Sequence, residues 1–298
     1  MATRRVGHMQ GLLCATAGVL LISPDALILR LAATDAWTLS FWRNLLTLVA
    51  YGILLALLPR TATFAVVMRL DKPALAIALL YAASSVFFVL SISLTAVANT
   101  LVIVSAGPIF AALFSVLFAR EAIALRTWVA SLLVCGGIAL VFAGEFHGHT
   151  LIGNLCALGA SGSLAATFVL MRHTGEGRML PLLLYGSLAA TVAVLPFAEP
   201  ASIETFGMTL LALHSLTLMP VSMLLLMGAT RLIPAPEVNL VLLLETLLGP
   251  LWVWWVIGEE PASTTLLGGA VLVGTLTVHS MIGLHAAMRV RHKQLAVP

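Results

Sequence analysis

The stretch that decides the fold is PEVNLVLLLETLLGPLWVWWVIGEE, residues 236–260. Between Glu237 and Glu259 it is almost entirely apolar over about 20 residues, which is enough for one helix to cross a bilayer. Glu245 lies in its middle, roughly 12 Å along the helix from Glu237 and near the midplane of a ~30 Å hydrocarbon core. A charge there costs about 2.5–3.5 kcal/mol on insertion scales, so Glu245 is expected to face a bundle interior or a watery cavity. We interpret this helix as part of a solute pathway.

The rest of the chain is equally apolar: 61% of its 298 residues are hydrophobic and 9% are charged, with a mean hydropathy of +1.09. This composition excludes a soluble domain and predicts a polytopic membrane protein. Because the apolar runs are about 20 residues long and do not alternate, helices are favoured over a barrel. The net charge of +3 comes from basic residues spread over short loops, which predicts no nucleic-acid partner. Three cysteines within apolar runs (Cys14, Cys135 and Cys156) predict free thiols.

Ten apolar runs predict ten membrane spans with short connections. The run from Met9 to Leu29 is long for the core of a signal peptide and lacks an A-x-A exit, so it is expected to be the first span. Loop 59–73 is the longest connection, and Val66–Met68 within it predicts a turn of helix lying on the surface. The expected spans are 9–30, 37–58, 74–94, 97–119, 124–143, 151–171, 179–198, 205–228, 235–257 and 264–285.

Charge predicts the orientation of these spans. Ten spans put both termini on one side, and thirteen of the fifteen Lys and Arg residues then share that side, leaving only Arg30 and Arg43 opposite. This is a strong positive-inside signal, so both termini are expected in the cytoplasm and the protein in a bacterial inner membrane.

Two halves of the chain resemble each other. Residues 11–15 (GLLCA) recur as residues 153–157 (GNLCA), and Glu121 aligns with Glu259 further on. The repeat is five spans long, so its second copy is expected to enter the membrane upside down, as in many secondary transporters. The predicted units are 1–146 and 147–288, followed by a basic cytoplasmic tail, 289–298.

Several short motifs together resemble the EamA family of the drug/metabolite transporter superfamily. They are Trp42-Arg43, the run Ser105-Ala106-Gly107-Pro108 with Phe110 and Glu121, Leu244-Glu245, Gly258-Glu259, and Gly268-Gly269 with Gly274. One position departs from the family pattern: Thr246 stands where Pro usually follows the glutamate, and Pro250 comes four residues later. The helix break is therefore expected to be displaced to Pro250.

The resemblance implies an all-α membrane protein with two inverted five-helix repeats around a central cavity, working by alternating access. Spans 1, 3, 4, 6, 8 and 9 would line the cavity, and spans 5 and 10 would lie at the periphery. It implies a non-enzymatic exporter of aromatic or hydrophobic amino acids or related small metabolites, with exporters of the YddG type as the nearest functional picture. An efflux carrier for drugs or nucleosides is the alternative within this class.

The candidate pathway residues are polar or aromatic side chains within apolar spans: Glu245, Asn99, Tyr81, His214, Asn239 and Trp252. Glu245 could bind a substrate ammonium or carry a coupling proton, or be a structural carboxyl bonded to a neighbouring helix. Asn99 and Asn239 could offer amides to a solute or bridge helices. Tyr81 and Trp252 could line the cavity or simply pack. His214 opens a polar patch that could line the pathway or belong to a packed, kinked helix.

A second group of candidates concerns gating and helix breaks. Pro24 and Pro108 interrupt their helices as Pro250 does. Asp25, after Pro24, could take up the freed backbone donors or pair with Arg43 from the next span. Such a pair would be structural or would form an external gate.

One rival class is an intramembrane serine protease. Residues 159–162 (GASG) match a G-x-S-G nucleophile signature, with Ser161 as nucleophile and His279 as base. We favour the transporter, for which the expected partners are a small-molecule substrate, the lipid bilayer and, as a candidate coupling ion, the proton. No cofactor, metal or catalytic residue is expected, and the protein is expected to be a monomer or weak dimer.

Overall fold

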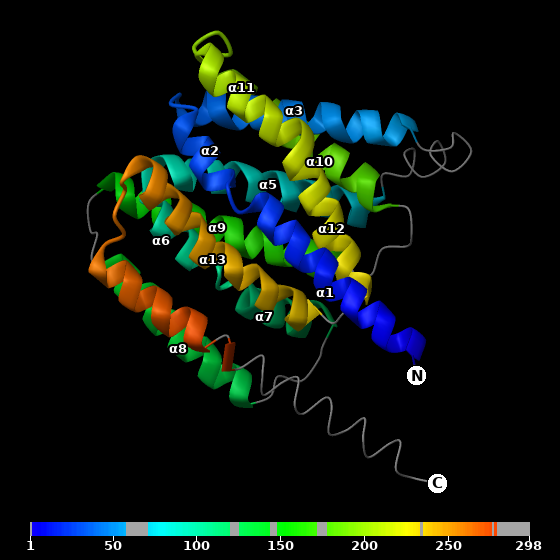
Figure 1. Ribbon diagram of the computed structural model, residues 1–298, viewed down its shortest axis with the longest axis vertical. Helices are drawn as coiled ribbons and strands as arrows, with labels where there is room; N and C mark the ends of the chain where they lie inside the picture. The colour runs from blue at the N-terminus through cyan, green and yellow to red at the C-terminus, as the bar shows by residue number, and fades with distance from the viewer. Residues whose placement is uncertain are drawn as a thin grey trace.

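A computed structural model describes residues 2–57, 71–119, 125–143, 148–171, 178–232, 235–275 and 277–278. The described chain is all-helical (Figure 1). The helices in order are α1 (Ala2–Ile22), α2 (Asp25–Leu31), α3 (Ala36–Leu57), α5 (Lys72–Leu94), α6 (Val97–Val104), α7 (Gly107–Ala119), α8 (Leu125–Ala143), α9 (Gly148–Met171), α10 (Met179–Val194), η1 (Leu195–Phe197), α11 (Thr205–Leu213), η2 (His214–Leu218), α12 (Met219–Leu232), α13 (Ala235–Ile257) and a helix over Ser263–Thr275.

Six helices of the described chain are long and apolar enough to cross a membrane, by length and composition: Met9–Leu31, Ala36–Leu57, Lys72–Leu94, Thr150–Met171, Met179–Phe197 and Thr205–Ala229. Shorter apolar helices cover Val97–Ala111, Leu244–Ile257 and Ser263–Thr275. The protein is thus a multi-pass helical membrane protein. The count of ten crossings and the inverted repeat remain predictions. Loop 59–73 lies almost wholly, and the tail 289–298 wholly, outside the described residues.

Three expected spans contain a local break in the α-helix. Between α1 and α2 the break falls at Ser23 and Pro24, as Pro24 predicts, because proline lacks the N–H that would continue the ladder. Between α6 and α7 it falls at Ser105 and Ala106, just before Pro108. Between α11 and α12 a π-helical turn, η2, begins at His214.

The break expected at Pro250 is absent, and this prediction was wrong. α13 continues through Pro250 to Ile257 as one helix. Gly249 lies directly against Leu101 of α6, where an added Cβ would collide with the Leu101 side chain. At this turn α13 thus packs closely against α6 and remains one continuous helix through the proline.

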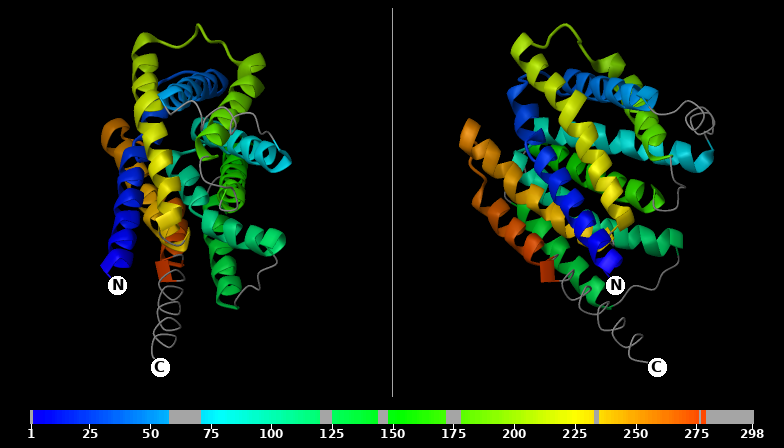
Figure 2. Two further views of the ribbon diagram at one scale, coloured as in Figure 1. Left: turned by 90° about the vertical axis from the view of Figure 1, so that its right-hand side faces the viewer. Right: turned by 45° about the vertical axis from the view of Figure 1, so that its right-hand side comes forward.

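The long helices form two bundles that interleave the two halves of the sequence. The first bundle is α1, α12 and α13, and the second is α5, α7 and α9; in side view they occupy opposite sides of the molecule (Figure 2). Each bundle takes helices from both halves of the chain. α3 packs against α10 and α5 and also against η2, so it connects the two bundles.

Small residues allow close approach within each bundle. In the second bundle, a Cβ on Gly153 of α9 would come within 2.8 Å of the Thr95 Cβ and 2.9 Å of the Leu94 carbonyl carbon. In the first, a Cβ on Gly18 of α1 would come within 3.2 Å of the Ser222 carbonyl oxygen, which lies on α12.

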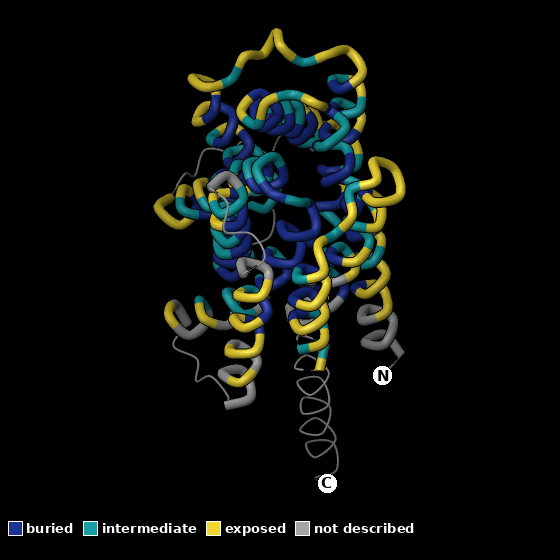
Figure 3. Tube along the Cα trace, turned by 90° about the vertical axis from the view of Figure 1, so that its left-hand side faces the viewer, coloured by how far each residue is buried: buried dark blue, intermediate teal, exposed yellow. Residues whose placement is uncertain are grey.

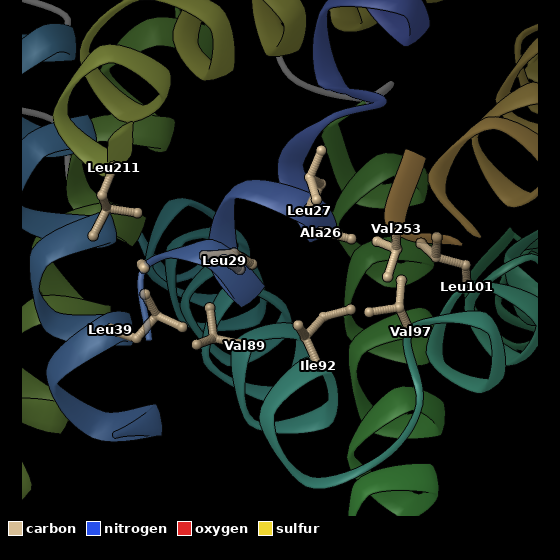
Figure 4. Close-up of a cluster of buried hydrophobic side chains, with 11 residues drawn as sticks. Ala26, Leu27, Leu29, Leu39, Val89, Ile92, Val97, Leu101, Leu211 and Val253 are labelled. Carbon is tan, nitrogen blue, oxygen red and sulfur yellow. The ribbon is translucent and has the colours of Figure 1, made fainter. Parts of the chain in front are cut away.

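Buried residues concentrate in the centre of the molecule and exposed ones on its outside (Figure 3). The largest apolar cluster draws on α2, α3, α5, α6, α11 and α13, and therefore on both bundles (Figure 4). Its members include Leu29, Leu39, Val89, Leu101 and Val253. This apolar cluster holds the two bundles together.

The helix Ser263–Thr275 and α8 lie side by side at one edge of the molecule (Figure 1). A Cβ on Gly137 of α8 would come within 3.0 Å of the Gly268 carbonyl oxygen on the other helix. These segments belong to expected spans 5 and 10, which were predicted at the periphery.

We expect Gly153→Ala to destabilise the protein by about 1–3 kcal/mol, the usual cost of overpacking. Its added methyl would meet the backbone of residues 94–95, which cannot rotate away as a side chain can. Thermal unfolding in detergent, followed by circular dichroism, measures the effect.

Gly52→Ala is the matched control, because no atom lies within 4 Å of a Cβ added there. Alanine is the better helix former by about 1 kcal/mol, so this variant should be as stable as the natural protein or more so. Equal behaviour of the two variants would contradict the close approach of α9 and α5.

Candidate functional site

A buried ion pair joins α2 and α3. Arg43 Nη2 donates to Asp25 Oδ2 at 2.7 Å, and the two side chains are only 4% and 2% exposed. Asp25 begins α2 directly after the break at Pro24, and no side-chain cap is made at this helix start. Of the two roles weighed for Asp25, the structure therefore places it with Arg43, and not with the backbone donors freed by Pro24.

Neighbouring polar groups from α3 and α5 hold Arg43 in place. Arg43 Nη1 donates to Ser85 Oγ at 2.8 Å, and Ser85 Oγ donates to Asn44 Oδ1 at 2.8 Å. Asn44 in turn donates to the Ser40 carbonyl oxygen at 2.8 Å. The guanidinium also lies 5.8 Å from the centre of the Phe88 ring. This network connects α3 to α5 in the second bundle.

His214 approaches the same carboxylate from the π-helical turn. Its Nδ1 lies 3.5 Å from Asp25 Oδ1, and its side chain is fully buried. Within the described chain, neither His214 ring nitrogen has a hydrogen-bond partner, and neither do Asp25 Oδ1 and Arg43 Nε. The pair of charges thus retains unused hydrogen-bonding atoms, which is unusual because buried polar groups are normally satisfied.

Glu245, the central carboxylate of the α13 stretch, lies close enough to Asp25 and Arg43 to interact with both electrostatically. The structure therefore brings four predicted residues (Glu245, His214, Asp25 and Arg43) into one cluster, which we call the central charged cluster. Its members come from α2, α3, η2 and α13, and Ser85 of the second bundle contacts it.

An apolar region rich in methionine and tyrosine adjoins the central charged cluster. It contains Tyr51, Tyr81, Met219, Met223 and Met227, all buried. The sulfur of Met219 lies 3.8 Å from Arg43 Nη2, so this region begins at the cluster itself. Tyr81, a predicted pathway residue, packs here directly against Gly186 of α10.

Asn99 bridges helices. Its amide donates to Thr95 Oγ1 at 3.2 Å, and its oxygen accepts from Thr265 of the helix Ser263–Thr275. This geometry matches the helix-bridging role considered for Asn99, and neither of these two partners belongs to the central charged cluster.

Trp252 and Ser161 are not members of the central charged cluster. Trp252 is part-exposed and donates from Nε1 to Ser23 Oγ at 3.2 Å. The side chains of Asn239 and Pro108 are outside the described residues. Ser161, the candidate nucleophile, is buried and donates to the Val104 carbonyl oxygen at 3.0 Å, while His279 is not described. Ser161 is thus engaged in helix packing.

A second set of polar contacts ties the bundles together at one end of the molecule, which we call the Arg30 end. Arg30 of α2 donates to the Thr95 carbonyl oxygen at 2.8 Å, and its Nε lies 3.3 Å from Glu259 Oε2. Glu259, just beyond α13, accepts from the Val97 backbone N–H at 2.9 Å. Arg30, on the helix that follows α1, and Glu259, just beyond α13, thus hold the corner where α5 ends and α6 begins.

The loops at the Arg30 end add contacts between the two halves of the sequence. Trp42 Nε1 donates to the Pro200 carbonyl oxygen at 3.0 Å, and the Glu199 backbone N–H donates to Thr38 Oγ1 at 2.8 Å. The sequence predicted neither of these two loop contacts, nor the contacts of Ser85 and Asn44 beside Arg43. Their residue types are common in helix packing, and only the fold brings them together.

The opposite end carries an exposed ion pair between Asp71 and Arg178. Arg178 Nη2 lies 2.9 Å from Asp71 Oδ2, and Asp71 also caps α5 by accepting from the Ala74 backbone N–H at 3.0 Å. The hydrogen bond from Arg178 lowers the pKa of Asp71 below its usual value, with the Ala74 N–H adding to the shift.

We expect Asp25→Asn to destabilise the protein by about 3–5 kcal/mol, because it leaves the buried Arg43 guanidinium without a counter-charge. The double variant Asp25→Asn, Arg43→Gln should recover part of this loss, since it removes both charges. Thermal unfolding in detergent tests the pair, with the exposed Glu204→Gln as control. Additive losses in the double variant would contradict a coupled buried pair.

We expect Asp71→Asn to lower the melting temperature slightly at neutral pH, because Asn keeps the helix cap but loses the ion pair with Arg178. The pKa of Asp71 is lower in the folded protein than in the unfolded chain, so the stabilisation is present above the unfolded value and is lost as the pH falls through the folded one. The difference between variant and natural protein should therefore vanish in acid, and also in high salt. A difference independent of pH would argue against this pair.

Comparison with known proteins bears on the fold and the family. A solved structure described only as "Crystal structure of protein" superimposes with a TM-score of 0.65 over 93% of this chain and 98% of that one, at 17% identity. At this identity the likeness shows the fold alone. A Bacillus subtilis protein, "Uncharacterized transporter YdfC", is 29% identical over 180 residues, and the chain spans only 58% of that protein's length.

The family comparison covers the first half of the chain. Residues 9–143 match the model of the EamA-like transporter family. This segment runs from the first expected span to the end of α8 and includes Asp25, Arg43 and Ser85 of the site. The matches agree with the expected non-enzymatic class, whereas a YddG-like specificity has no support from them. Residues 9–143 are thus similar to the EamA-like transporter family, within a chain whose described helices are those of a multi-pass membrane protein.

Proposed function

We propose that this protein is a secondary transporter for a small zwitterionic solute, with amino acids bearing aromatic or hydrophobic side chains as the leading substrates. The observation that carries the proposal is the buried Asp25–Arg43 pair with unused hydrogen-bonding atoms around it. Ionisable residues within membrane spans are costly and mark solute or ion pathways.

A zwitterion suits this pair because it can replace each charge's partner in one step. The planar guanidinium of Arg43 matches a carboxylate, and Asp25 or Glu245 can accept from an ammonium. Inserting a zwitterion between Asp25 and Arg43 would leave neither charge uncompensated. A solute of single charge would leave one of them unpaired in a buried setting.

The region of Met219, Met223 and Met227 supports a substrate with a sizeable apolar part. Methionine is flexible and polarizable, so a surface built from it can adapt to side chains of different shape. Tyr51 and Tyr81 add aromatic surface next to it. The same adaptability favours the second candidate, a carrier of varied amphiphilic drugs or nucleoside-like metabolites.

The packing supports two inverted halves and alternating access. α5 packs on α9 as α1 packs on α12, and α7 packs on α9 as α1 packs on α13. In a five-span repeat, span 1 corresponds to span 6, span 3 to span 8 and span 4 to span 9. Exchanging corresponding spans turns the α5–α9 contact into the α1–α12 contact, and the α7–α9 contact into the α1–α13 contact. Inverted repeats of this kind commonly place the solute between them at the midplane.

The sidedness follows from charge alone. With the Lys- and Arg-rich side in the cytoplasm, the Arg30 end faces outward, and its contacts to Thr95 and Val97 close the outer side. The arrangement then corresponds to a carrier closed to the outside. Export across a bacterial inner membrane, with both termini cytoplasmic, is the proposed direction.

The test is efflux from proteoliposomes preloaded with labelled aromatic, branched, Thr/Met-type and basic amino acids. We expect saturable efflux of the aromatic or branched members. Arg43→Lys keeps the charge but loses the planar fork, so it should raise the half-saturating substrate concentration at least tenfold, equivalent to about 1.4 kcal/mol.

Glu204→Gln is the control variant, because Glu204 is exposed and its side chain caps no helix. It should transport as the natural protein does. Folded protein that moves no member of the panel would reject the amino-acid assignment. Efflux of nucleosides or amphiphilic drugs instead would favour the second candidate.

A further inference from the structure

His214 is fully buried, and within the described chain its two ring nitrogens make no hydrogen bond. Leaving a buried polar group without a hydrogen bond is costly, so native proteins rarely contain one. Asp25 Oδ1, an acceptor that also lacks a hydrogen-bond partner in the described chain, lies 3.5 Å from Nδ1. A small movement would join them.

The backbone holds His214 at this point by an uncommon device. It is the first residue of the π-helical turn η2, His214–Leu218, between α11 and α12. Single π turns are rare and occur frequently at functional sites. Pro220 follows shortly after, and its missing N–H is compatible with a turn that departs from the α-helical ladder.

Asp25 is shared between two basic groups. Its Oδ2 accepts from Arg43 Nη2 at 2.7 Å, while its Oδ1 faces His214. The other titratable groups around the site are Glu245 of α13, Tyr51 of α3 and Tyr81 of α5. Among these, His214 is the side chain whose ordinary titration falls between pH 5 and 8.

We propose that His214 and Asp25 form a proton site that is coupled to substrate binding. This rests on the proposed function, in which the substrate ammonium also uses Asp25. A protonated His214 would donate Nδ1–H to Asp25 Oδ1 and compete with the ammonium for the same carboxylate. One proton bound at His214 replaces one ammonium at Asp25, so the charge facing Asp25 is conserved.

The consequence is proton–substrate antiport. A proton that reaches His214 from the more acidic side weakens the hold of Asp25 on the substrate ammonium and promotes release there. Return of His214 to its neutral form restores Asp25 for the next substrate. The carboxylate end of the substrate stays with Arg43 until release, so Arg43 acts in binding and His214 in coupling.

The experiment separates coupling from transport. Counterflow, the exchange of labelled for unlabelled amino acid at equal pH, reports transport alone. Uptake against a concentration gradient, driven by an imposed pH difference, reports coupling. We expect the natural protein to show both, and His214→Gln to retain counterflow while losing the pH-driven accumulation. Ser215→Ala, the adjacent buried position on the same turn, should retain both.

A measurement without substrate keeps the inference testable on its own. The chain has eight histidines, so ¹⁵N-histidine NMR of the protein in detergent should show one titrating resonance that is lost in His214→Gln. The midpoint of that resonance should change in Asp25→Asn. If His214→Gln fails to fold, His214→Asn replaces it.

The outcomes are distinct. Absence of counterflow in the natural protein contradicts the proposed function, and with it the antiport. Counterflow without pH-driven accumulation, or accumulation unchanged in His214→Gln, overturns the coupling role alone. A His214 resonance that does not titrate, or one indifferent to Asp25→Asn, overturns the proton site itself.

Discussion

The buried pair of Asp25 and Arg43 is the constraint on which the centre of the molecule depends. Removing two charges from water costs several kcal/mol each, and attraction repays this only when geometry and further hydrogen bonds are good. The break at Pro24 lets Asp25 begin a new helix pointing at α3. Ser85 and Asn44 then fix the guanidinium from α5 and α3. Three helices are thus positioned by one ion pair.

The helices around the pair pack closely because glycines lie at their contacts. Gly18, Gly153 and Gly186 bring neighbouring helices so close that a Cβ would enter occupied space. In lipid, where apolar side chains gain little by leaving the solvent, such close approach is a main source of helix association. Tight contacts within each bundle leave the junction between bundles as the region where polar side chains gather, and the central charged cluster lies there.

Much of this fold could be read from the sequence, but less of the site could. Run length alone placed the long spans, and Pro24 located a true break, because both depend on local chemistry. Pro250 led to a wrong prediction of a helix break: α13 is unbroken there, and it packs tightly against Leu101 of α6. Pairing of Asp25 with Arg43 could be anticipated because buried charges need partners. The approach of His214 to Asp25 could not be anticipated, because it depends on a π-helical turn that no sequence pattern predicted.

The two sets of polar contacts differ in how easily they can be broken, and this difference suits a carrier. Arg30 and Glu259 are each more than a quarter exposed, so water can replace their contacts and the Arg30 end can open at little cost. Asp25 and Arg43 are almost fully buried, and separating them without replacement would strand two charges. A ligand that supplies both opposite charges removes that cost. In the proposed carrier, the Arg30 end would therefore act as a gate, while the buried pair would respond only to a solute able to take its place.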